Sequence, residues 1–169
     1  GTATGVSQDV VITINGTNDA PVVTSSAQTG TITESADVLP SGPDADPTDA
    51  TGTITFTDVD LSDNPTASVD ATVGLTSTLA NGYVLSAPQI TALENAFSLD
   101  NGTNTNFTAG GGSIAWTYDV ANANIDFLGE NDSVELTFQV DIDDGTATGV
   151  SQDVVITING TNDAPVVTS

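Results

Sequence analysis

The sequence contains no cysteine, lysine, arginine or histidine. Without cysteine no disulfide can brace the fold, and without lysine no lysine–asparagine isopeptide bond can crosslink it. The 23 aspartate and glutamate residues meet no basic side chain, so the formal net charge is −23. Binding to nucleic acid or to an anionic membrane surface depends on basic patches, and both are excluded. No apolar run approaches the ~20 residues of a transmembrane helix, so we expect no membrane insertion.

The missing residue types also remove most catalytic chemistry. No histidine, cysteine or lysine is present to act as a general base or covalent nucleophile. Only a pair of carboxylates could act, as in glycosidases. The acids here lie in loops beside a repeated segment, which would place one active site in every repeat. We therefore expect that the protein is not an enzyme.

One segment occurs twice without a single change. The sequence GTATGVSQDVVITINGTNDAPVVTS occupies residues 1–25 and again residues 145–169. This identity indicates a tandem array with a period of 145 − 1 = 144 residues, the size of one ordinary domain. No signal peptide precedes the repeat, so we expect an internal part of a longer region.

The repeat predicts the domain boundaries. We expect residues 1–17 to be the last strand of a preceding repeat and residues 18–162 to form one complete repeat with its N-terminal linker. Residues 163–169 then begin the next repeat. The first copy has lost the partners that the preceding repeat would supply. We predict that an edge of this domain or a neighbouring molecule holds residues 1–15.

Alternating apolar and polar residues predict the strands. The clearest run is residues 134–142, where Val, Leu, Phe, Val and Ile alternate with polar residues. The same alternation occurs at residues 54–56, 114–118 and 154–158. Clusters of Gly, Asn, Asp and Pro between these runs supply the turns. The pattern predicts an all-β fold, an immunoglobulin-like or cadherin-like antiparallel β-sandwich.

Other segments depart from this alternation. Apolar residues at helical spacing after Pro88 predict one short helix over residues 88–97, on a crossover between strands. Residues 122–128 are predicted to form a single helical turn. Residues 37–49 and 101–112 are predicted to be loops because of their proline, aspartate and glycine content.

The carboxylates gather at the predicted strand ends. Because neighbouring strands alternate in direction, two strand ends and the incoming linker are expected to share one pole of the sandwich. That pole would hold the linker residues Asn18 and Asp19, the strand-end residues Asp58, Asp60 and Asp63, and the hairpin residues Asp141, Asp143 and Asp144. At the other pole we expect Glu34, Glu130 and Asp132, joined by Asn162 and Asp163 of the outgoing linker.

Such clusters predict a cation. Two carboxylates 4 Å apart repel by about 4 kcal/mol at an effective dielectric constant near 20, and the chain has no lysine or arginine to neutralise them. Ligands that are all oxygen select a hard ion, and six to eight flexible oxygens fit Ca²⁺ better than Mg²⁺ or Zn²⁺. The alternative is that these residues are capping and turn residues that favour loops.

The C-terminal sequence resembles a known family. The stretch GSIAWTYDVANANIDFLGENDSVELTFQVDIDDGTATGVSQDVVITINGTNDAPVV is similar to the C-terminal half of a VCBS repeat. That module occurs in large numbers along bacterial RTX surface adhesins and biofilm proteins. The match covers most of residues 113–167, and FTDVDLSD in the first half is also similar. The GGxGxD nonapeptide of RTX β-rolls is absent.

The layout also resembles the cadherin repeat, which holds calcium between successive domains. By that resemblance Glu34 is the first-strand glutamate, and Asp58 with Asp60 is the DxD pair. Glu130 or Asp132 matches the DRE acids, Asp143 or Asp144 the last-hairpin aspartate, and Asn18 with Asp19 the linker. The sequence departs from the family in its shorter NDAP linker and in lacking a literal DRE triplet.

These resemblances imply an extracellular extender on a bacterial surface. Its partners would be neighbouring repeats of the same protein, stiffened by Ca²⁺ at the linkers, and a distal domain would bind a glycan or protein ligand. The alternative is that the sandwich itself binds a glycan or protein through its loops or through aromatic residues such as Trp116 or Tyr118. A single tryptophan in a β-sandwich is more typically a core residue, so we expect Trp116 in the core.

Overall fold

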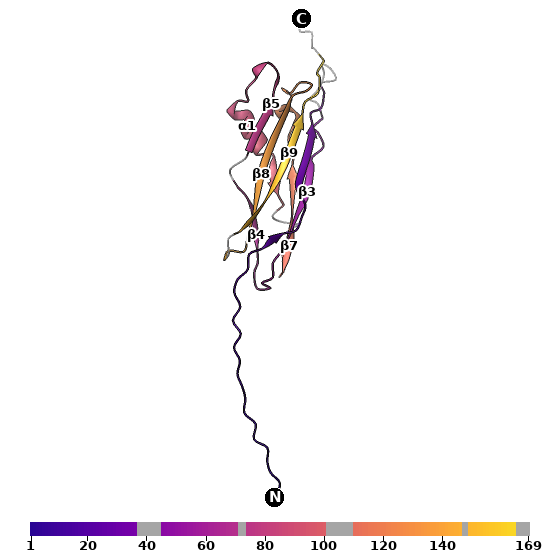
Figure 1. Ribbon diagram of the computed structural model, residues 1–169. Coiled ribbons are helices and arrows are strands. Elements are labelled where there is room, and N and C mark those ends of the chain that lie inside the picture. The colour runs from indigo at the N-terminus through magenta and orange to yellow at the C-terminus, as the bar shows by residue number, and fades with distance from the viewer. Residues whose placement is uncertain (37–44, 71–73, 101–109, 147–148, 165–169) are drawn as a thin grey trace.

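A computed structural model describes residues 1–36, 45–70, 74–100, 110–146 and 149–164 of the protein (Figure 1). These residues form two β-sheets that pack face to face, with short helical segments between some of the strands. The predicted all-β, immunoglobulin-like sandwich is therefore confirmed. None of the helices in the described part of the chain is long and apolar enough to cross a membrane.

The two sheets differ in size. The smaller has the order β1-β3-β7-β6, with β1 (Val22–Val23), β3 (Ala50–Thr57), β7 (Gly111–Tyr118) and β6 (Phe97–Leu99). The larger has the order β2-β9-β8-β4, with β2 (Gln28–Thr33), β9 (Val150–Asn159), β8 (Ser133–Asp143) and β4 (Thr66–Val69), and β5 (Gly74–Thr78) also pairs with β8. Strand β8 contains residues 134–142, the run with the clearest alternation in the sequence, and every second residue of this run is buried.

The pairing of β2 with β9 departs from the predicted antiparallel sandwich. These strands run parallel, with Gln28 opposite Val154 and Thr33 opposite Asn159. The reason is that the first stretch of the repeat serves both sheets: β1 pairs with β3 in one sheet, and the chain then continues into β2 of the other. Strands β2 and β9 therefore end at the same pole.

The helical segments are η1 (Ala80–Gly82), α1 (Ala87–Glu94) and η2 (Asn122–Asn124). Helix α1 begins after Ser86, whose backbone N–H and hydroxyl both donate to the Gln89 side chain. The predicted helix is confirmed, but it ends before residue 97 because Phe97 pairs with Tyr118 as the first residue of β6. The predicted helical turn at 122–128 is present as η2.

Two predicted loops lie partly outside the described residues. Of residues 37–49, the structure describes 45–49, which carry no helix or strand. Of residues 101–112, it describes 110–112, and here Gly111 and Gly112 already belong to β7 rather than to the loop. Gly111 has φ of +132° and lies so close to the Phe56 carbonyl that a side chain would clash, so only glycine can begin the strand there.

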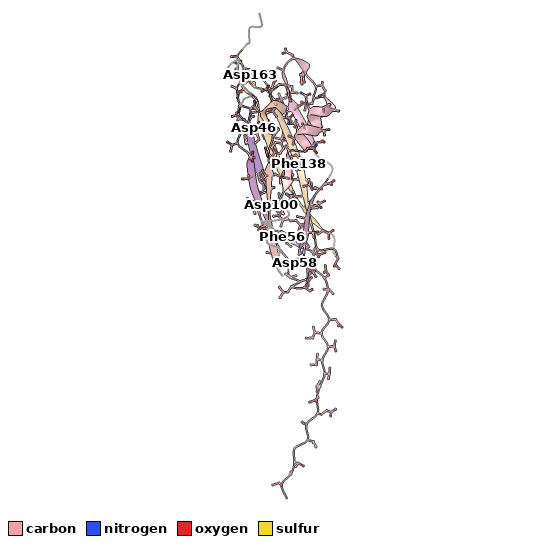
Figure 2. The ribbon with its side chains drawn as sticks, turned by 180° about the vertical axis from the view of Figure 1, so that it is seen from behind. Asp46, Phe56, Asp58, Asp100, Phe138 and Asp163 are labelled. Atoms are coloured by element: carbon pink, nitrogen blue, oxygen red, sulfur yellow. The ribbon has the colours of Figure 1, made fainter. Side chains whose placement is uncertain are left out.

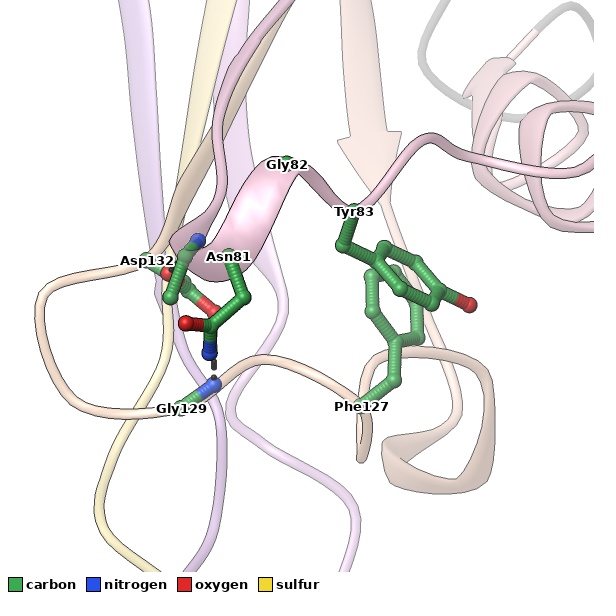
Figure 3. Close-up of a pocket in the computed structure, with 7 residues that line it drawn as sticks. Asn81, Gly82, Tyr83, Phe127, Gly129 and Asp132 are labelled. Atoms are coloured by element: carbon green, nitrogen blue, oxygen red, sulfur yellow. Dashed lines mark hydrogen bonds between the residues drawn. The ribbon is translucent and has the colours of Figure 1, made fainter.

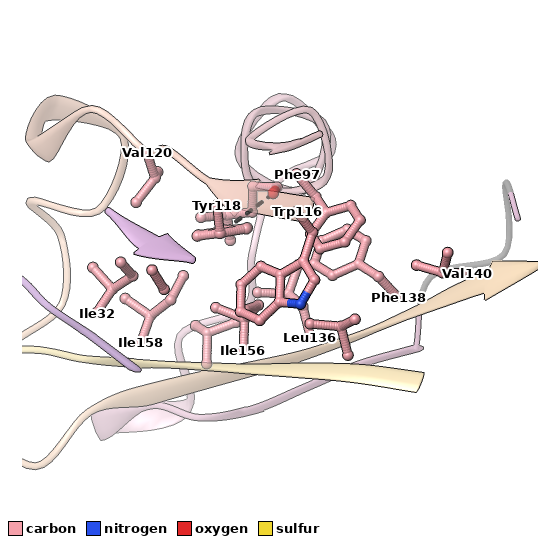
Figure 4. Packing of buried hydrophobic residues seen from close by; sticks show 14 of the residues in the cluster. Ile32, Phe97, Trp116, Tyr118, Val120, Leu136, Phe138, Val140, Ile156 and Ile158 are labelled. Carbon is pink, nitrogen blue, oxygen red and sulfur yellow. Dashed lines mark hydrogen bonds between the residues drawn. The ribbon is translucent and has the colours of Figure 1, made fainter. Parts of the chain in front are cut away.

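The core lies between the sheets and contains most of the aromatic rings (Figure 4). Phe97 stacks on Phe138 with ring centroids 4.3 Å apart, and Trp116 is 1% exposed. The Trp116 indole donates to Gln28 Oε1 at 3.0 Å, and the Tyr118 hydroxyl donates to the Leu93 carbonyl at 3.0 Å. Burial raises the pKa of the Tyr118 hydroxyl. The expectation that Trp116 is a core residue is confirmed.

The two copies of the repeated segment have different surroundings, and the first extends from one end of the sandwich as a tail (Figure 1). The second copy forms β9 inside the larger sheet, whereas residues 1–20 form no strand and residues 1–19 are all exposed. The prediction that an edge of this domain holds residues 1–15 is therefore wrong. In a complete domain this sequence forms the strand between β2 and β8, and the second copy already occupies that position as β9. A neighbouring molecule as its partner stays a prediction.

Candidate metal centre

Three aspartates converge where β3 ends, at the pole where the first linker enters, here called the N-terminal pole. Asp58 follows β3 directly, and its backbone N–H donates to Gly110 O at 3.1 Å. The Asp63 N–H donates to Asp60 O at 3.1 Å, and the resulting turn brings Asp63 back toward Asp58. One carboxylate oxygen from each of Asp58, Asp60 and Asp63 lies within 4.8 Å of the others.

Asp58 is 5% exposed and lies at the end of the sandwich from which the first linker extends (Figure 2). Its Oδ1 accepts the Asp60 N–H at 2.9 Å, while Oδ2 is buried without a hydrogen-bond partner among the described residues. Asp63 Oδ2 is likewise buried and has no hydrogen-bond partner among the described residues. Two carboxylates at this separation repel by about 3.5 kcal/mol at an effective dielectric constant of 20, and buried oxygens without partners are costly. A bound cation would offset this repulsion and give the buried oxygens a partner.

The first linker closes over this cluster. The Asp19 N–H donates to Asp60 Oδ2 at 2.6 Å, and the Asn18 amide donates to Asp144 Oδ2 at 3.0 Å. A surface hollow lies between the linker and the cluster and is lined by Gly16, Thr17, Asn18, Asp60, Ser62 and Asp63. The linker is thus docked on the domain that follows it by contacts with two different loops.

The hairpin aspartates have separate roles. Asp143 Oδ1 accepts the Gly145 N–H and Asp144 Oδ1 accepts the Thr146 N–H, both at 2.7 Å, so each organises the turn after β8. Asp144 also accepts the Asn18 amide of the linker. Asp141 lies within β8 opposite Ser151, two residues before the strand ends at Asp143. Of the eight residues expected at this pole, the structure brings Asp58, Asp60 and Asp63 into one carboxylate group and places Asn18, Asp19 and Asp144 beside it.

At the opposite, C-terminal pole the outgoing linker contacts a buried glutamate. Glu34 follows β2, is 2% exposed and donates its N–H to Asn159 O at 2.9 Å. Its Oε2 accepts the Thr161 N–H at 2.9 Å and also the Thr161 hydroxyl. Its Oε1 is buried and has no partner in the described part of the chain. One carboxylate therefore holds the start of the linker and still has a free oxygen.

The other acids expected at this pole do not join Glu34. Asp132 Oδ1 accepts the Ala80 N–H at 2.7 Å and Oδ2 accepts the Gly129 N–H at 3.1 Å, so Asp132 ties two loops together. Glu130 is exposed, Asp163 is partly buried, and the Asn162 amide donates to Asp163 O at 3.2 Å. Among the described residues no second carboxylate group assembles at this pole.

The sequence interpretation missed a buried amide near Glu34. Asn122 of η2 is 2% exposed, and its Oδ1 accepts the Ser35 N–H at 2.8 Å. Its amide nitrogen donates to Asp126 Oδ1 at 3.0 Å, and its backbone N–H donates to Asp46 Oδ1 at 2.8 Å. Asn122 fixes the residue after Glu34 and so positions that carboxylate. An asparagine in a helical turn between two apolar residues was the only sequence signal for it.

Neither a protein-family model nor a curated protein sequence matches the chain. Among solved structures, the chain is similar to AggA, the major subunit of aggregative adherence fimbriae type I from Escherichia coli. The sequence identity is 14% and the TM-score is 0.38, and the alignment covers 86% of this chain and 99% of that chain. A likeness this distant carries no argument about function.

Proposed function

We propose that the chain is an extender module of a bacterial surface adhesin of the VCBS or cadherin-like kind. Tandem β-sandwiches would be joined end to end, and Ca²⁺ at each joint would turn a self-repelling string of acidic domains into a stiff rod. The rod would project a distal binding domain away from the cell. The protein is then structural and extracellular rather than catalytic.

The observation that carries this proposal is that the same linker sequence contacts a domain at each of its ends. Residues 160–163 repeat residues 16–19 without change. Thr161 is held by Glu34 of the domain that precedes the linker. In the other copy, Asn18 and Asp19 are held by Asp144 and Asp60 of the domain that follows.

In a tandem array both sets of contacts would belong to one linker. Thr17 is the equivalent of Thr161, and it lies two residues before Asp19, a span of at most roughly 7 Å. The buried Glu34 of one repeat would then approach Asp58, Asp60 and Asp63 of the next. Two half-sites that are separated by the whole length of a single domain would become one joint.

The donor atoms fit a hard cation. Asp58 Oδ2, Asp63 Oδ2 and Glu34 Oε1 are buried oxygens without partners in the described part of the chain. Ca²⁺ takes six to eight oxygen ligands and accepts carboxylates together with backbone and amide carbonyls. A bound ion would offset the repulsion among the carboxylates, which no basic residue of the chain can do.

The expected energetic effect is moderate for each joint but adds along the array. A site occupied at free Ca²⁺ of about 100 times its dissociation constant adds about 2.7 kcal/mol of stability, and extracellular modules use constants near 10⁻⁴ to 10⁻³ M. Removing Ca²⁺ should therefore soften the joints before it unfolds the sandwiches.

Calorimetric titration of Ca²⁺ tests the proposal when one repeat is compared with a protein lengthened by one further period. The joint combines Glu34 of one repeat with Asp58 of the next, so the longer protein should show a tighter class of sites that is absent from the single repeat. If both proteins bind Ca²⁺ with the same affinity per repeat, or neither binds it, the joint is not a calcium site.

The alternative function is glycan or protein binding through the loops or aromatic residues of the sandwich, and burial removes only Trp116 and Tyr118 from it. Both side chains lie in the core and are at most 1% exposed. Neither ring can therefore reach a ligand without unfolding the sandwich.

A further inference from the structure

A hollow beside η1 has no role in the proposed joint (Figure 3). It has a volume of about 420 Å³ and lies between the η1 turn and the loop that follows η2. Its lining residues are Ala80, Asn81, Gly82, Tyr83, Phe127, Gly129 and Asp132. This volume lies within the range of sites that hold small molecules.

One side of the hollow is an aromatic platform held in place before any ligand arrives. The Tyr83 ring stacks on Phe127 with centroids 5.7 Å apart and planes inclined by 27° (Figure 3). Gln89 Nε2 donates to the Tyr83 hydroxyl at 3.0 Å, and Gln89 itself caps helix α1. Tyr83 nevertheless stays 49% exposed. Because stacking on Phe127 and the hydrogen bond to Gln89 already hold the Tyr83 ring, the ring would lose little conformational entropy when a ligand binds to it.

Polar groups stand on the other side. The Asn81 side-chain amide makes no hydrogen bond among the described residues, and Asn81 holds a positive φ of 57°. Each Asp132 oxygen accepts one backbone N–H, which leaves lone pairs for a further donor. Gly82 and Gly129 carry no side chain to fill the space between these groups and the rings.

The charge of the protein narrows the ligand class. With no basic residue and a net charge of −23, the hollow cannot attract phosphates, sulfates or acidic sugars. A quaternary ammonium ion is recognised by rings that surround it as a cage. Tyr83 and Phe127 stack on each other, so they present one flat face and no cage.

We infer that this hollow binds a neutral pyranose saccharide. The apolar C–H face of the sugar would lie on the Tyr83 ring, and its hydroxyls would pair with the Asn81 amide and the Asp132 carboxylate. Asp132 O also accepts the Gly160 N–H at 3.0 Å, so the site adjoins the outgoing linker. An array would present one copy per repeat, and weak sites in a row gain strength through avidity.

NMR titration of the full chain with methyl β-D-glucopyranoside, methyl β-D-galactopyranoside and methyl α-D-mannopyranoside tests the inference. For one pyranose ring in an open site we expect a dissociation constant on the order of a millimolar, so each sugar is taken to roughly 20 mM. Amide signals of Tyr83, Phe127 and Gly129 should shift with at least one sugar. No shift with any of the three sugars overturns the inference, as does a shift with choline chloride alone.

Matched variants separate the site from a general effect. Tyr83→Ala should abolish the shifts, whereas Tyr83→Phe should keep them because the ring remains. Asn81→Gly removes the amide at a backbone conformation that glycine adopts freely and should weaken binding severalfold. Val84→Ala, at an exposed neighbour outside the hollow, should change nothing. Shifts that persist in a folded Tyr83→Ala protein would place the sugar elsewhere and overturn the inference.

Discussion

We expect the substitution Asp58→Asn to raise the free energy of unfolding in the absence of Ca²⁺ and to lower it in the presence of Ca²⁺. Asp58 is almost fully buried, and its carboxylate lies within 4.8 Å of those of Asp60 and Asp63. The asparagine keeps the shape and the oxygen that accepts the Asp60 N–H, but it removes the charge. Without a cation the substitution therefore relieves repulsion, and with Ca²⁺ it removes a ligand.

The magnitude follows from the geometry. Removing the Asp58 charge abolishes two of the three repulsive pairs in the group. Each pair is worth about 3.5 kcal/mol at a dielectric constant of 20, so the sum has an upper limit of about 7 kcal/mol. Asp60 and Asp63 are partly exposed, and solvent screening reduces the expected gain to about 1–3 kcal/mol.

The assay is denaturant unfolding of both proteins in excess chelator and in millimolar Ca²⁺. In chelator Asp58→Asn should have the larger free energy of unfolding, and in Ca²⁺ the unsubstituted protein should. Asp153→Asn is the matched control, because Asp153 is exposed on β9 outside the cluster and should change stability little in either condition. A variant that is less stable than the unsubstituted protein by the same amount in both conditions would show that the Asp58 charge neither repels its neighbours nor binds Ca²⁺.

Three further substitutions test other parts of the account. A Cβ at Gly52 would lie 2.5 Å from the Trp116 ring, so Gly52→Ala should lower the free energy of unfolding by about 1–3 kcal/mol; an unchanged denaturation midpoint would mean that the ring can move aside. Burial raises the pKa of the Tyr118 hydroxyl above its usual value near 10. The free energy of unfolding should therefore be constant below about pH 10 and fall above it, because the unfolded chain loses this proton more easily. Tyr118→Phe should remove that fall in alkaline unfolding curves. Thr161→Val removes the hydrogen bonds of the Thr161 hydroxyl to Glu34 and should cost about 1 kcal/mol, with faster amide exchange at residues 160–163. Exchange rates equal to those of the unsubstituted protein would show that this hydroxyl does not help to hold the linker.

Strand positions were predictable because one buried face imposes a period of two. The run that became β8 alternates without a break, and each of its apolar residues from Val134 to Ile142 is buried. Strand pairing was not predictable in the same way, since alternation carries no information about a neighbour's direction. The parallel pair of β2 and β9 arises because the chain changes sheets between Val23 and Gln28, and no local pattern marks that crossing.

The candidate site was predictable to the extent that its residues are local in sequence. Asp58, Asp60 and Asp63 follow one strand, and a single turn gathers them. The second pole depends on contacts between distant loops. Asp132 resembles a ligand in the sequence, but in the structure it ties the Ala80 and Gly129 loops together and joins no group of carboxylates among the described residues. Asn122 binds Ser35, the residue after Glu34, across 87 residues of chain, so spacing alone could not reveal it.

In the proposed array, Ca²⁺ stiffens the joint between repeats. Small-angle X-ray scattering from a protein of two consecutive repeats, recorded in Ca²⁺ and in excess chelator, tests it most directly. We predict a maximum dimension about twice that of one sandwich in Ca²⁺ and a broader, shorter distance distribution in chelator, with Asp58→Asn giving the chelator profile in both. Identical profiles in Ca²⁺ and chelator for the unsubstituted protein would contradict the claim.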